Sequence, residues 1–463
     1  MPIALIAAWC VAGLLAALTA HVVYVGLRER RGRAAAVSGC LLGGLTLLWC
    51  AAVVLLPGLR AAAVIVFITA VAVLAILMFA PIGRRYALPA APGERFDERM
   101  VMFARARYSP GDGRYETFYL EHPELNEPDD AIREMPRLGE PGSATWDPLN
   151  APVQDALFGW LDRVRETASG PVAEGAVRMD PGDAAVRLKG MAMAMGAVSA
   201  GTTAVRPGHV YSRIGRGSGV WGAQLDPGRY PYALVFAVEM AHEMVGSAPM
   251  QPAVADSSRQ YVEAAKIALA IATYLRALGH RARAHIDGNY RLVLPPLAAD
   301  AGLGEVGRLS LLITPEYGPR VRLGAVTTSL TLPQDEPVKF GVEDFCRTCS
   351  KCARNCPSRA LPLGDKEGVR GTSYWRIDPL ACYRYWLRVG SDCGLCIAVC
   401  PYSHPRALMH SLVRAACRRS AVSRRIFSWA DDLFYGRSPR SRRYPGWMLA
   451  GLDDEARERL GLR

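Results

Sequence analysis

Eight cysteines in the C-terminal third of the chain have the spacing of iron–sulfur ligands. Each run is close to C-x2-C-x2-C-x3-C-P, which surrounds a [4Fe–4S] cube with thiolates, and the fourth cysteine of a run usually serves the other cluster. The first run is CRTCSKCARNCP, and the second is CGLCIAVCP with a further cysteine eleven residues upstream. The predicted ligand sets are Cys346, Cys349, Cys352 and Cys400 for one cluster, and Cys356, Cys382, Cys393 and Cys396 for the other.

Two other uses of these cysteines are less consistent with the spacing. Zinc sites usually take two separated C-x2-C pairs without a trailing C-x3-C-P. Disulfides require an oxidising compartment. Cys382 lies further from the next cysteine than the motif requires, so a longer loop must bring its thiolate to the cluster. The spacing therefore predicts two [4Fe–4S] clusters and a role in electron transfer.

Three apolar stretches at the N-terminus are each long enough to cross a membrane. They cover about residues 3–27, 35–56 and 61–81, with arginine only at their edges. A hydrocarbon core of roughly 30 Å needs about 20 such residues in a helix. A secretory signal peptide would have a basic start and a shorter apolar core. We therefore expect three transmembrane helices in a multi-pass protein.

The charged loops predict the orientation of these helices. RERRGR at 28–33 carries four arginines, Arg60 is the single charge at 57–60, and Arg84 and Arg85 follow the third stretch. The positive-inside rule places the two basic segments in the cytoplasm. The N-terminus is then outside and residues 82–463 face the cytoplasm, at the cell inner membrane.

The formal net charge of +12 does not indicate a nucleic-acid partner, because much of it lies in two places. One is the basic membrane loop, and the other is a C-terminal segment in which arginines alternate with aromatic residues. Such a segment is suited to anionic membrane lipid, although a solvated surface with ordinary packing explains it equally well. Its arginines are Arg418, Arg419, Arg424, Arg425, Arg437, Arg440, Arg442 and Arg443.

The remaining chain reads as a layered α/β region followed by the cysteine module. After a proline-rich link at 80–93, residues 94–150 predict an extended wrap with short helices. Periodicity predicts helices at 147–168 and 257–279, the second beginning near Ser257 and ending at Gly279. Strands are expected in RARAHI, RLVLPP, SLLIT and VRLGAVTTSL. The predicted divisions are 1–85 (membrane anchor), 86–150 (linker and wrap), 151–338 (core), 339–410 (α+β ferredoxin-like module) and 411–463 (a segment packing on the core or the membrane surface).

Two short motifs do not identify a further cofactor. GRGSG at 215–219 lacks the strand–turn–helix setting of a dinucleotide site, so it predicts either a loop near a ligand or a surface turn. HEM at 242–244 is followed by no second histidine at the spacing of a zinc hydrolase.

Blocks around the cysteines resemble the cobalamin-dependent reductive dehalogenases. They are RFDERMVMFARARYSPGDGRYETFYLEHPELNEPDDAIREMP (95–136), PPLAADAGLGEVGRLSLLITPEYGPRVRL (295–323), WRIDPLACYRYW (375–386), and DDLFYG (431–436) followed by YPGW. The A-G-L-G-E-x-G-R and P-E-x-G elements are more specific than a ferredoxin motif. The resemblance covers roughly residues 95–450.

This resemblance implies a nitroreductase-like core that holds a base-off cobalamin beside one cluster. It also implies that Tyr261 donates a proton, that Asn289 lies in the pocket, and that Arg322 stabilises the tyrosinate or the departing halide. Arg320, two residues away, is an alternative for the basic position. The implied cobalamin contacts are Gly302, Leu303, Gly304 and Arg320. The implied activity is replacement of halogen by hydrogen in organohalides, and aromatic residues near the pocket favour halogenated aromatics.

Two alternatives and one partner follow from the same comparison. Epoxyqueuosine reductases have a similar A-G-L-G block but use an aspartate, for which Asp287 is the candidate. A membrane ferredoxin without its own catalysis would need only the helices and clusters, and would leave residues 95–335 unexplained. No segment resembles a fused reductase domain, so we expect a separate electron donor, either a ferredoxin, a flavodoxin or membrane quinol.

Overall fold

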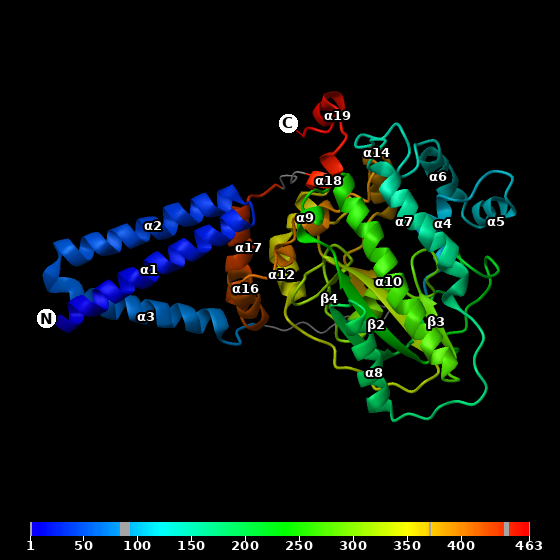
Figure 1. Cartoon of the computed structure of the whole chain (residues 1–463), viewed down its shortest axis with the longest axis horizontal. Coiled ribbons are helices and arrows are strands. Elements are labelled where there is room, and N and C mark those ends of the chain that lie inside the picture. Colours follow the sequence, from blue (N-terminus) through cyan, green and yellow to red (C-terminus); the bar gives the residue numbers. More distant parts are fainter. Residues whose placement is uncertain (1, 84–92, 370–371, 439–443, 463) are drawn as a thin grey trace. The chain divides into compact units, whose positions relative to one another are not determined.

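The computed structural model describes residues 2–83, 93–369, 372–438 and 444–462, which belong to two compact units (Figure 1). The first unit comprises residues 2–83, 340–349 and 405–438, and the second comprises 93–339, 350–369, 372–404 and 444–462. Most of the predicted link at 80–93, with Arg84 and Arg85, lies outside the described residues, as do Arg440, Arg442 and Arg443. The units divide the chain differently from the predicted domain boundaries, which stay a prediction.

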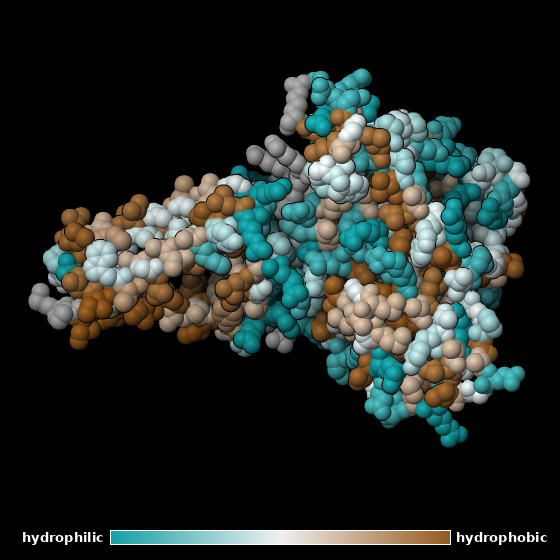
Figure 2. All heavy atoms as spheres, viewed as in Figure 1, coloured by the Kyte–Doolittle hydropathy of each residue, from teal (hydrophilic) through white to brown (hydrophobic). Residues whose placement is uncertain are grey.

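The first unit contains the three predicted apolar helices. They are α1 (Pro2–Arg28), α2 (Gly32–Leu55) and α3 (Arg60–Phe79), with the 3-10 turn η1 (Pro57–Leu59) before α3. All three are long and apolar enough to cross a membrane, and hydrophobic side chains extend along them (Figure 2). The expected helices at 3–27, 35–56 and 61–81 are confirmed.

Three further helices complete the first unit at one end of this bundle. They are α12 (Val342–Cys349), α16 (Leu408–Arg419) and α17 (Ala421–Tyr435). The Ser420 and Ser423 hydroxyls donate to the carbonyls of Leu77 (2.7 Å) and Met78 (2.8 Å) in the last turn of α3. Carbonyls at a helix end lack partners within the helix, so these serines fasten α17 to the membrane bundle.

A four-stranded antiparallel sheet forms the centre of the second unit. Its order is β1 (Ser199–Ala204), β2 (Tyr232–Glu239), β6 (Val321–Thr328) and β3 (Ala282–His285). Side chains of β2 alternate between two hydrophobic clusters, because successive residues of a strand point to opposite faces. Leu234, Phe236 and Val238 pack with α7 (Ala151–Val164), α8 (Pro181–Ala194) and α10 (Gln251–Ala277). Ala233, Val235 and Ala237 pack with α11 (Leu294–Asp300).

The structure corrects two sequence expectations in this core. RLVLPP is not a strand: Leu292 makes only an isolated bridge with Val210, and helix α11 begins at Leu294. Its two prolines stand in the first helical turn, where a backbone N–H is not needed. Helix α10 begins at Gln251 rather than near Ser257, with Pro252 in its first turn, and Gly279 (φ +80°) follows its end as expected.

Several short elements of the second unit lie outside the central sheet. Residues 94–150 contain small helices, two of which are joined by a buried ion pair between Arg105 and Asp129 (2.6 Å). Its helical elements are η2 (Glu98–Met100), α4 (Met102–Arg105), α5 (Gly113–Glu121), η3 (Pro123–Leu125) and α6 (Asn126–Arg133). The other short elements are η4 (Arg165–Ala168), η5 (Pro207–His209), α9 (His242–Val245), β4 (Glu305–Val306), β5 (Leu312–Ile313), η6 (Pro401–Ser403), α18 (Gly446–Leu449) and α19 (Asp454–Arg459).

The cysteine-bearing part of the second unit consists of small helices and one hairpin. These are α13 (Lys351–Arg354), β7 (Glu367–Val369), β8 (Thr372–Tyr374), α14 (Pro379–Val389) and α15 (Leu395–Ala398). Arg308, the arginine of the A-G-L-G-E-V-G-R block, donates to the carbonyls of Pro362 (2.7 Å) and Gly364 (2.8 Å). Its guanidinium also stacks 4.7 Å from the ring centroid of the buried Trp375. These contacts give two of the blocks that resemble the dehalogenases a structural role.

Candidate active site

Tyr261 lies on α10 where this helix packs on the sheet. It is ten residues beyond the first residue of the helix, so it stands in the helix interior rather than in the expected first or second turn. Its ring packs at the edge of the core and lies 6.2 Å from the Phe158 ring, centroid to centroid. The side chain keeps part of its surface accessible. A rigid helix therefore holds a phenol at the margin of the core.

Arg322 on β6 faces this tyrosine. Its guanidinium carbon lies 4.8 Å from the centroid of the Tyr261 ring, within the range of a cation–π contact. Nη2 donates to Asp392 Oδ2 at 2.8 Å and to the Ser257 hydroxyl. Nε is buried and has no hydrogen-bond partner among the described residues. A buried donor without a partner is costly, so the arrangement suits a bound acceptor or anion beside Tyr261.

The charges around Tyr261 bear on its acidity. Burial raises the pKa of Tyr261, and the cation of Arg322 opposes that shift. Burial would lower the pKa of Arg322, but Tyr261 and Asp392 keep it above its usual value. Arg322 therefore stabilises the deprotonated form of Tyr261, which a proton donor must pass through.

A second tyrosine and two more charged groups belong to the same electrostatic environment. Burial raises the pKa of Tyr290 well above its usual value, with further contributions from Tyr261 and Asp287. Arg216, in the GRGSG loop, acts on both tyrosines and is paired with Glu98 (3.3 Å). The loop therefore belongs to the electrostatic surroundings of Tyr261 and Tyr290.

The two candidate arginines have different environments. Arg320 is fully buried and precedes β6. It donates to the carbonyl of Ser403 (2.6 Å), to Glu239 (3.0 Å) and to the carbonyl of Met240 (2.5 Å). It is therefore Arg322 that lies beside Tyr261, whereas Arg320 fastens the turn that follows Cys400 to the sheet.

Asn289 is fully buried, and all of its amide groups have protein partners. Its nitrogen donates to the carbonyl of Arg165 (2.8 Å) and to Ser218 Oγ (3.0 Å), and its oxygen accepts from Arg283 (2.7 Å). Gly217 (φ +70°) packs so closely that a Cβ there would lie 2.5 Å from this oxygen. Asn289 thus holds the GRGSG loop in place.

The residues of the A-G-L-G block form a tightly packed turn after α11. Gly302 has a φ of +77°, and a Cβ on it would lie 2.8 Å from the carbonyl oxygen of Glu336. A Cβ on Gly304 would lie 2.2 Å from the carbonyl oxygen of Ile313. Leu303 is buried in the cluster around α11. Close packing of the chain therefore accounts for both glycines.

The cysteines of the second predicted cluster lie within electrostatic reach of one another. Burial raises the pKa of Cys382 to about 11 and that of Cys393 to about 12, and Cys356 contributes to both shifts. Burial also raises the pKa of Cys396 well above its usual value, with contributions from the other three. Such thiols ionise when a metal supplies positive charge, so the four residues fit a cluster. Cys382, the displaced ligand, is among them.

The first predicted set is divided between the two units. Cys346 and Cys349 lie on α12 in the first unit, and Cys352 and Cys400 lie in the second. Cys352 also contributes to the pKa shift of Cys396. Within the second unit, members of the two predicted sets therefore adjoin.

Sequence reasoning missed Asp392 as part of the site. It precedes Cys393, and its carboxylate pairs with Arg322, which is 70 residues distant in the chain. Ser391 fixes the same turn by accepting from the Cys393 N–H (3.1 Å) and donating to the Pro249 carbonyl. An acidic residue immediately before a cysteine run was the signal that could have indicated this contact.

Comparisons with known proteins show what the chain is similar to. Residues 345–404 match the 4Fe-4S dicluster domain family. A tetrachloroethene reductive dehalogenase from Desulfitobacterium hafniense is 37% identical over 221 residues, which cover 44% of this chain and 40% of the relative. The chain is related to the reductive dehalogenases. The match spans less than half of that relative's length, so it concerns the shared part of the two proteins.

A solved structure shows the same relationship at the level of the fold. The catabolic reductive dehalogenase NpRdhA, in complex with 3-bromo-4-hydroxybenzoic acid, superposes with a TM-score of 0.63 at 24% identity, covering 78% of this chain and 50% of that one. The epoxyqueuosine reductase of Lactococcus garvieae is 37% identical over 118 residues, 24% of this chain and 32% of the relative. Both predicted relationships, the near one and the distant one, are confirmed.

Proposed function

We propose that the chain is a membrane-anchored reductive dehalogenase that replaces a halogen of an organohalide, preferably a halogenated aromatic, by hydrogen. The observation that carries the proposal is the Tyr261–Arg322 pair, with a buried guanidinium N–H that no described residue accepts. The similarity to reductive dehalogenases supports it.

Tyr261 is the proposed proton donor. The overall change consumes the organohalide, two electrons and one proton, and yields the compound with hydrogen in place of the halogen and a halide ion. The phenol gives its proton to carbon, and the nearby cation of Arg322 stabilises the tyrosinate until solvent restores the proton. The free Nε of Arg322 is placed to donate to the departing halide or to the substrate. Asp392 and Ser257 hold the guanidinium in this position.

Asn289 contributes to the pocket by positioning. Its hydrogen bond to Ser218 orders the loop that carries Arg216, and Arg216 acts electrostatically on Tyr261 and Tyr290. We therefore place Asn289 behind the reacting groups, with no free amide atom directed at a substrate.

The cofactor that we propose beside this site is a base-off cobalamin in a nitroreductase-like core. When bound, it supplies the electrons that break the carbon–halogen bond. We propose that the tight turn at Gly302, Leu303 and Gly304 lies against it. Arg320 adds a positive charge behind the turn after Cys400, with Nη2 as the one nitrogen that lacks a hydrogen bond among the described residues.

Two [4Fe–4S] clusters would deliver the electrons one at a time through the eight cysteines of the predicted sets. We expect the electrons to come from a separate ferredoxin, flavodoxin or membrane quinol. The apolar helices α1 to α3 support an inner-membrane location. The arginines of the loop between α1 and α2 favour a catalytic part that faces the cytoplasm.

A halide-release assay tests this function. The full chain, purified without oxygen and supplied with cobalamin, should contain about eight iron atoms and release bromide from bromophenols under a strong reductant. Chlorophenols and haloalkanes, assayed in the same way, define the substrate class. Reconstituted protein that binds cobalamin and iron but releases no halide from any of these compounds would contradict the proposal.

Epoxyqueuosine reduction is the second candidate, because Asp287 lies in the same electrostatic environment. It affects the pKa of both Tyr261 and Tyr290, and an aspartate is the proton donor that this alternative requires. Loss of epoxyqueuosine reduction in an Asp287→Asn variant, together with its retention in Tyr261→Phe, would favour this candidate. If the reconstituted chain retained no cobalamin, both enzymatic functions would be excluded, and a membrane electron carrier would remain as the function.

A further inference from the structure

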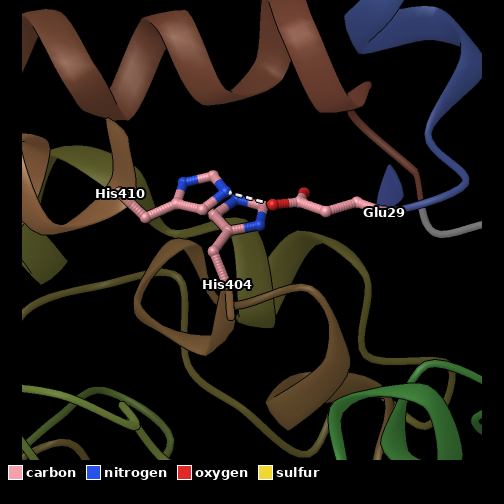
Figure 3. Close-up of side chains that lie close together, drawn as sticks. All are labelled: Glu29, His404 and His410. Atoms are coloured by element: carbon pink, nitrogen blue, oxygen red, sulfur yellow. Dashed lines mark hydrogen bonds and ion pairs between the residues drawn. The ribbon is translucent and has the colours of Figure 1, made fainter. Parts of the chain in front are cut away.

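Helix α16 shows an inverted distribution of side chains. In water a helix usually buries its apolar face, but the buried side of α16 includes His410 and Arg414 besides two small residues, Ala416 and Cys417. Its outward side shows Leu408, which is 65% exposed, and Leu412, which is 48% exposed. His410 Nε2 is bound to Glu29 Oε1 at 2.7 Å (Figure 3). Helix α16 therefore buries polar groups beside the loop between α1 and α2, and leaves an apolar stripe exposed.

Arginines continue the same exposed stripe. Leu408, Leu412 and Ala415 follow one another at helical spacing, and Arg418 and Arg419 complete the row at the C-terminal end of the helix. An outward face that joins leucines to arginines is typical of helices lying in a membrane interface.

The neighbouring helix α17 repeats this combination. Arg425, Ile426 and Trp429 share one face and are exposed, Ile426 to 41% and Trp429 to 65%. Tryptophan is enriched at the level of the lipid headgroups because its ring is apolar and its N–H is polar. Arginine pairs with phosphate through two parallel hydrogen bonds.

The position of these helices within the first unit matches a headgroup layer. Within that unit α16 and α17 run across the end of the bundle formed by α1, α2 and α3 (Figure 1). Helix α17 is fastened to that end by the bonds of Ser420 and Ser423 to α3, and by Arg33 at the start of α2, whose Nε donates to the Leu433 carbonyl at 3.0 Å. A pair of helices crossing the ends of transmembrane helices lies where the phosphates of a leaflet are.

We propose that the exposed faces of α16 and α17 form a binding surface for anionic phospholipid, defined by Leu408, Leu412, Arg418, Arg419, Arg425, Ile426 and Trp429. The apolar residues enter the boundary between headgroups and acyl chains, and the three arginines bind lipid phosphates. This inference rests on the proposed membrane anchoring and names the lipid class that the anchor selects.

Trp429 provides the test on the full chain in lipid nanodiscs. The nanodiscs contain increasing fractions of brominated phosphatidylglycerol or, in parallel, brominated phosphatidylcholine, and bromine quenches a nearby tryptophan. The difference between the unmodified chain and a Trp429→Phe variant isolates the emission of Trp429. We expect quenching at a lower fraction of phosphatidylglycerol than of phosphatidylcholine, and a weaker preference at high salt.

A combined variant, Arg418→Gln with Arg419→Gln and Arg425→Gln, should lose this preference, by about fivefold for each arginine removed. The matched control replaces three exposed arginines of the second unit, Arg178, Arg187 and Arg281, by glutamine and should keep it. Equal quenching by both lipids, or equal loss in the control, would overturn the inference and leave dehalogenation and anchoring intact.

Two other outcomes also count against the lipid surface. A chain that does not enter nanodiscs would overturn the anchoring and the lipid surface together. If neither lipid quenched Trp429 and the mass of the particle showed two copies of the chain, the exposed faces would be assigned to self-association. Halide release, measured on the same preparations, reports separately on the dehalogenase proposal.

Discussion

The side chains of Arg322 and Asn289 differ in how completely the protein satisfies their hydrogen bonds, although the sequence predicted both residues in one pocket. The Asn289 amide has three protein partners and no unused hydrogen-bonding group. Arg322 has a carboxylate, a hydroxyl and an aromatic face around it, yet one buried N–H has no partner among the described residues. The Asn289 amide is fully used by the fold, whereas the N–H of Arg322 that no described residue accepts, beside Tyr261, can take a water, an ion or a ligand as its partner.

The largest effect that the comparison predicts is that of Tyr261→Phe. Removal of the hydroxyl takes away the proposed proton donor while the ring keeps its packing against Phe158 and Arg322. Turnover should fall by about 10²–10⁴-fold, the usual contribution of a general acid. Iron content and the cluster absorption should not change. Normal halide release from this variant would place the donor elsewhere.

Arg322→Gln should be the next most damaging change. It removes the cation that stabilises the tyrosinate and the free donor beside it. The expected loss in kcat is about a hundredfold, as for other preorganised donors at developing charge. Arg320→Gln is compared at equal cobalamin content, because Arg320 is a proposed cobalamin contact and bonds to the Ser403 carbonyl instead of Tyr261. If the Arg320 variant lost kcat and the Arg322 variant did not, the assignment of the two arginines would be reversed.

Asp392→Asn tests whether the turn at Cys393 orients Arg322. The variant weakens the 2.8 Å ion pair and keeps the size of the side chain. We expect about a tenfold fall in kcat, since a hydrogen bond to a charged group is worth about 1.5–3 kcal/mol. Asp392→Glu should recover part of the activity. Equal losses in both variants, together with altered cluster spectra, would indicate a structural effect on the cysteine loop alone.

Asn289→Ala should change kcat least and stability most. It removes the hydrogen bond to the Arg165 carbonyl and the 2.7 Å bond from Arg283, which keeps its bond to Ser169, and should lower the free energy of unfolding by about 2–3 kcal/mol. Thermal unfolding of the anaerobic protein measures this loss. A large fall in kcat at unchanged Tm would instead indicate that Asn289 contacts the substrate directly.

Local sequence patterns predicted the helix and the strand that carry the site. The contacts between distant segments could not be predicted from these patterns. The periodicity around Tyr261 and the apolar run after Arg322 correctly indicated α10 and β6. Strand alternation suggested that Arg320 and Arg322 point the same way, but β6 begins at Val321, so the rule does not apply to Arg320. The contact between Arg322 and Asp392 depends on how two distant segments pack, and spacing cannot show that.

The RLVLPP segment shows the same limit on a smaller scale. Its apolar residues favoured a strand, yet the prolines belong to the first turn of α11. The membrane helices were more predictable, because length and lack of charge alone determine whether a segment can span a bilayer.

The central claim, that Arg322 tunes Tyr261 as the proton donor, is tested most directly by replacing Tyr261 with a fluorinated tyrosine. A fluorinated phenol is more acidic, and a donor acts only while it holds its proton. Halide release measured against pH should then decline at a lower pH than in the unmodified enzyme. Adding Arg322→Gln should move the decline back to higher pH, because loss of the cation raises the pKa of the phenol. A decline at the same pH in all three proteins would contradict the account.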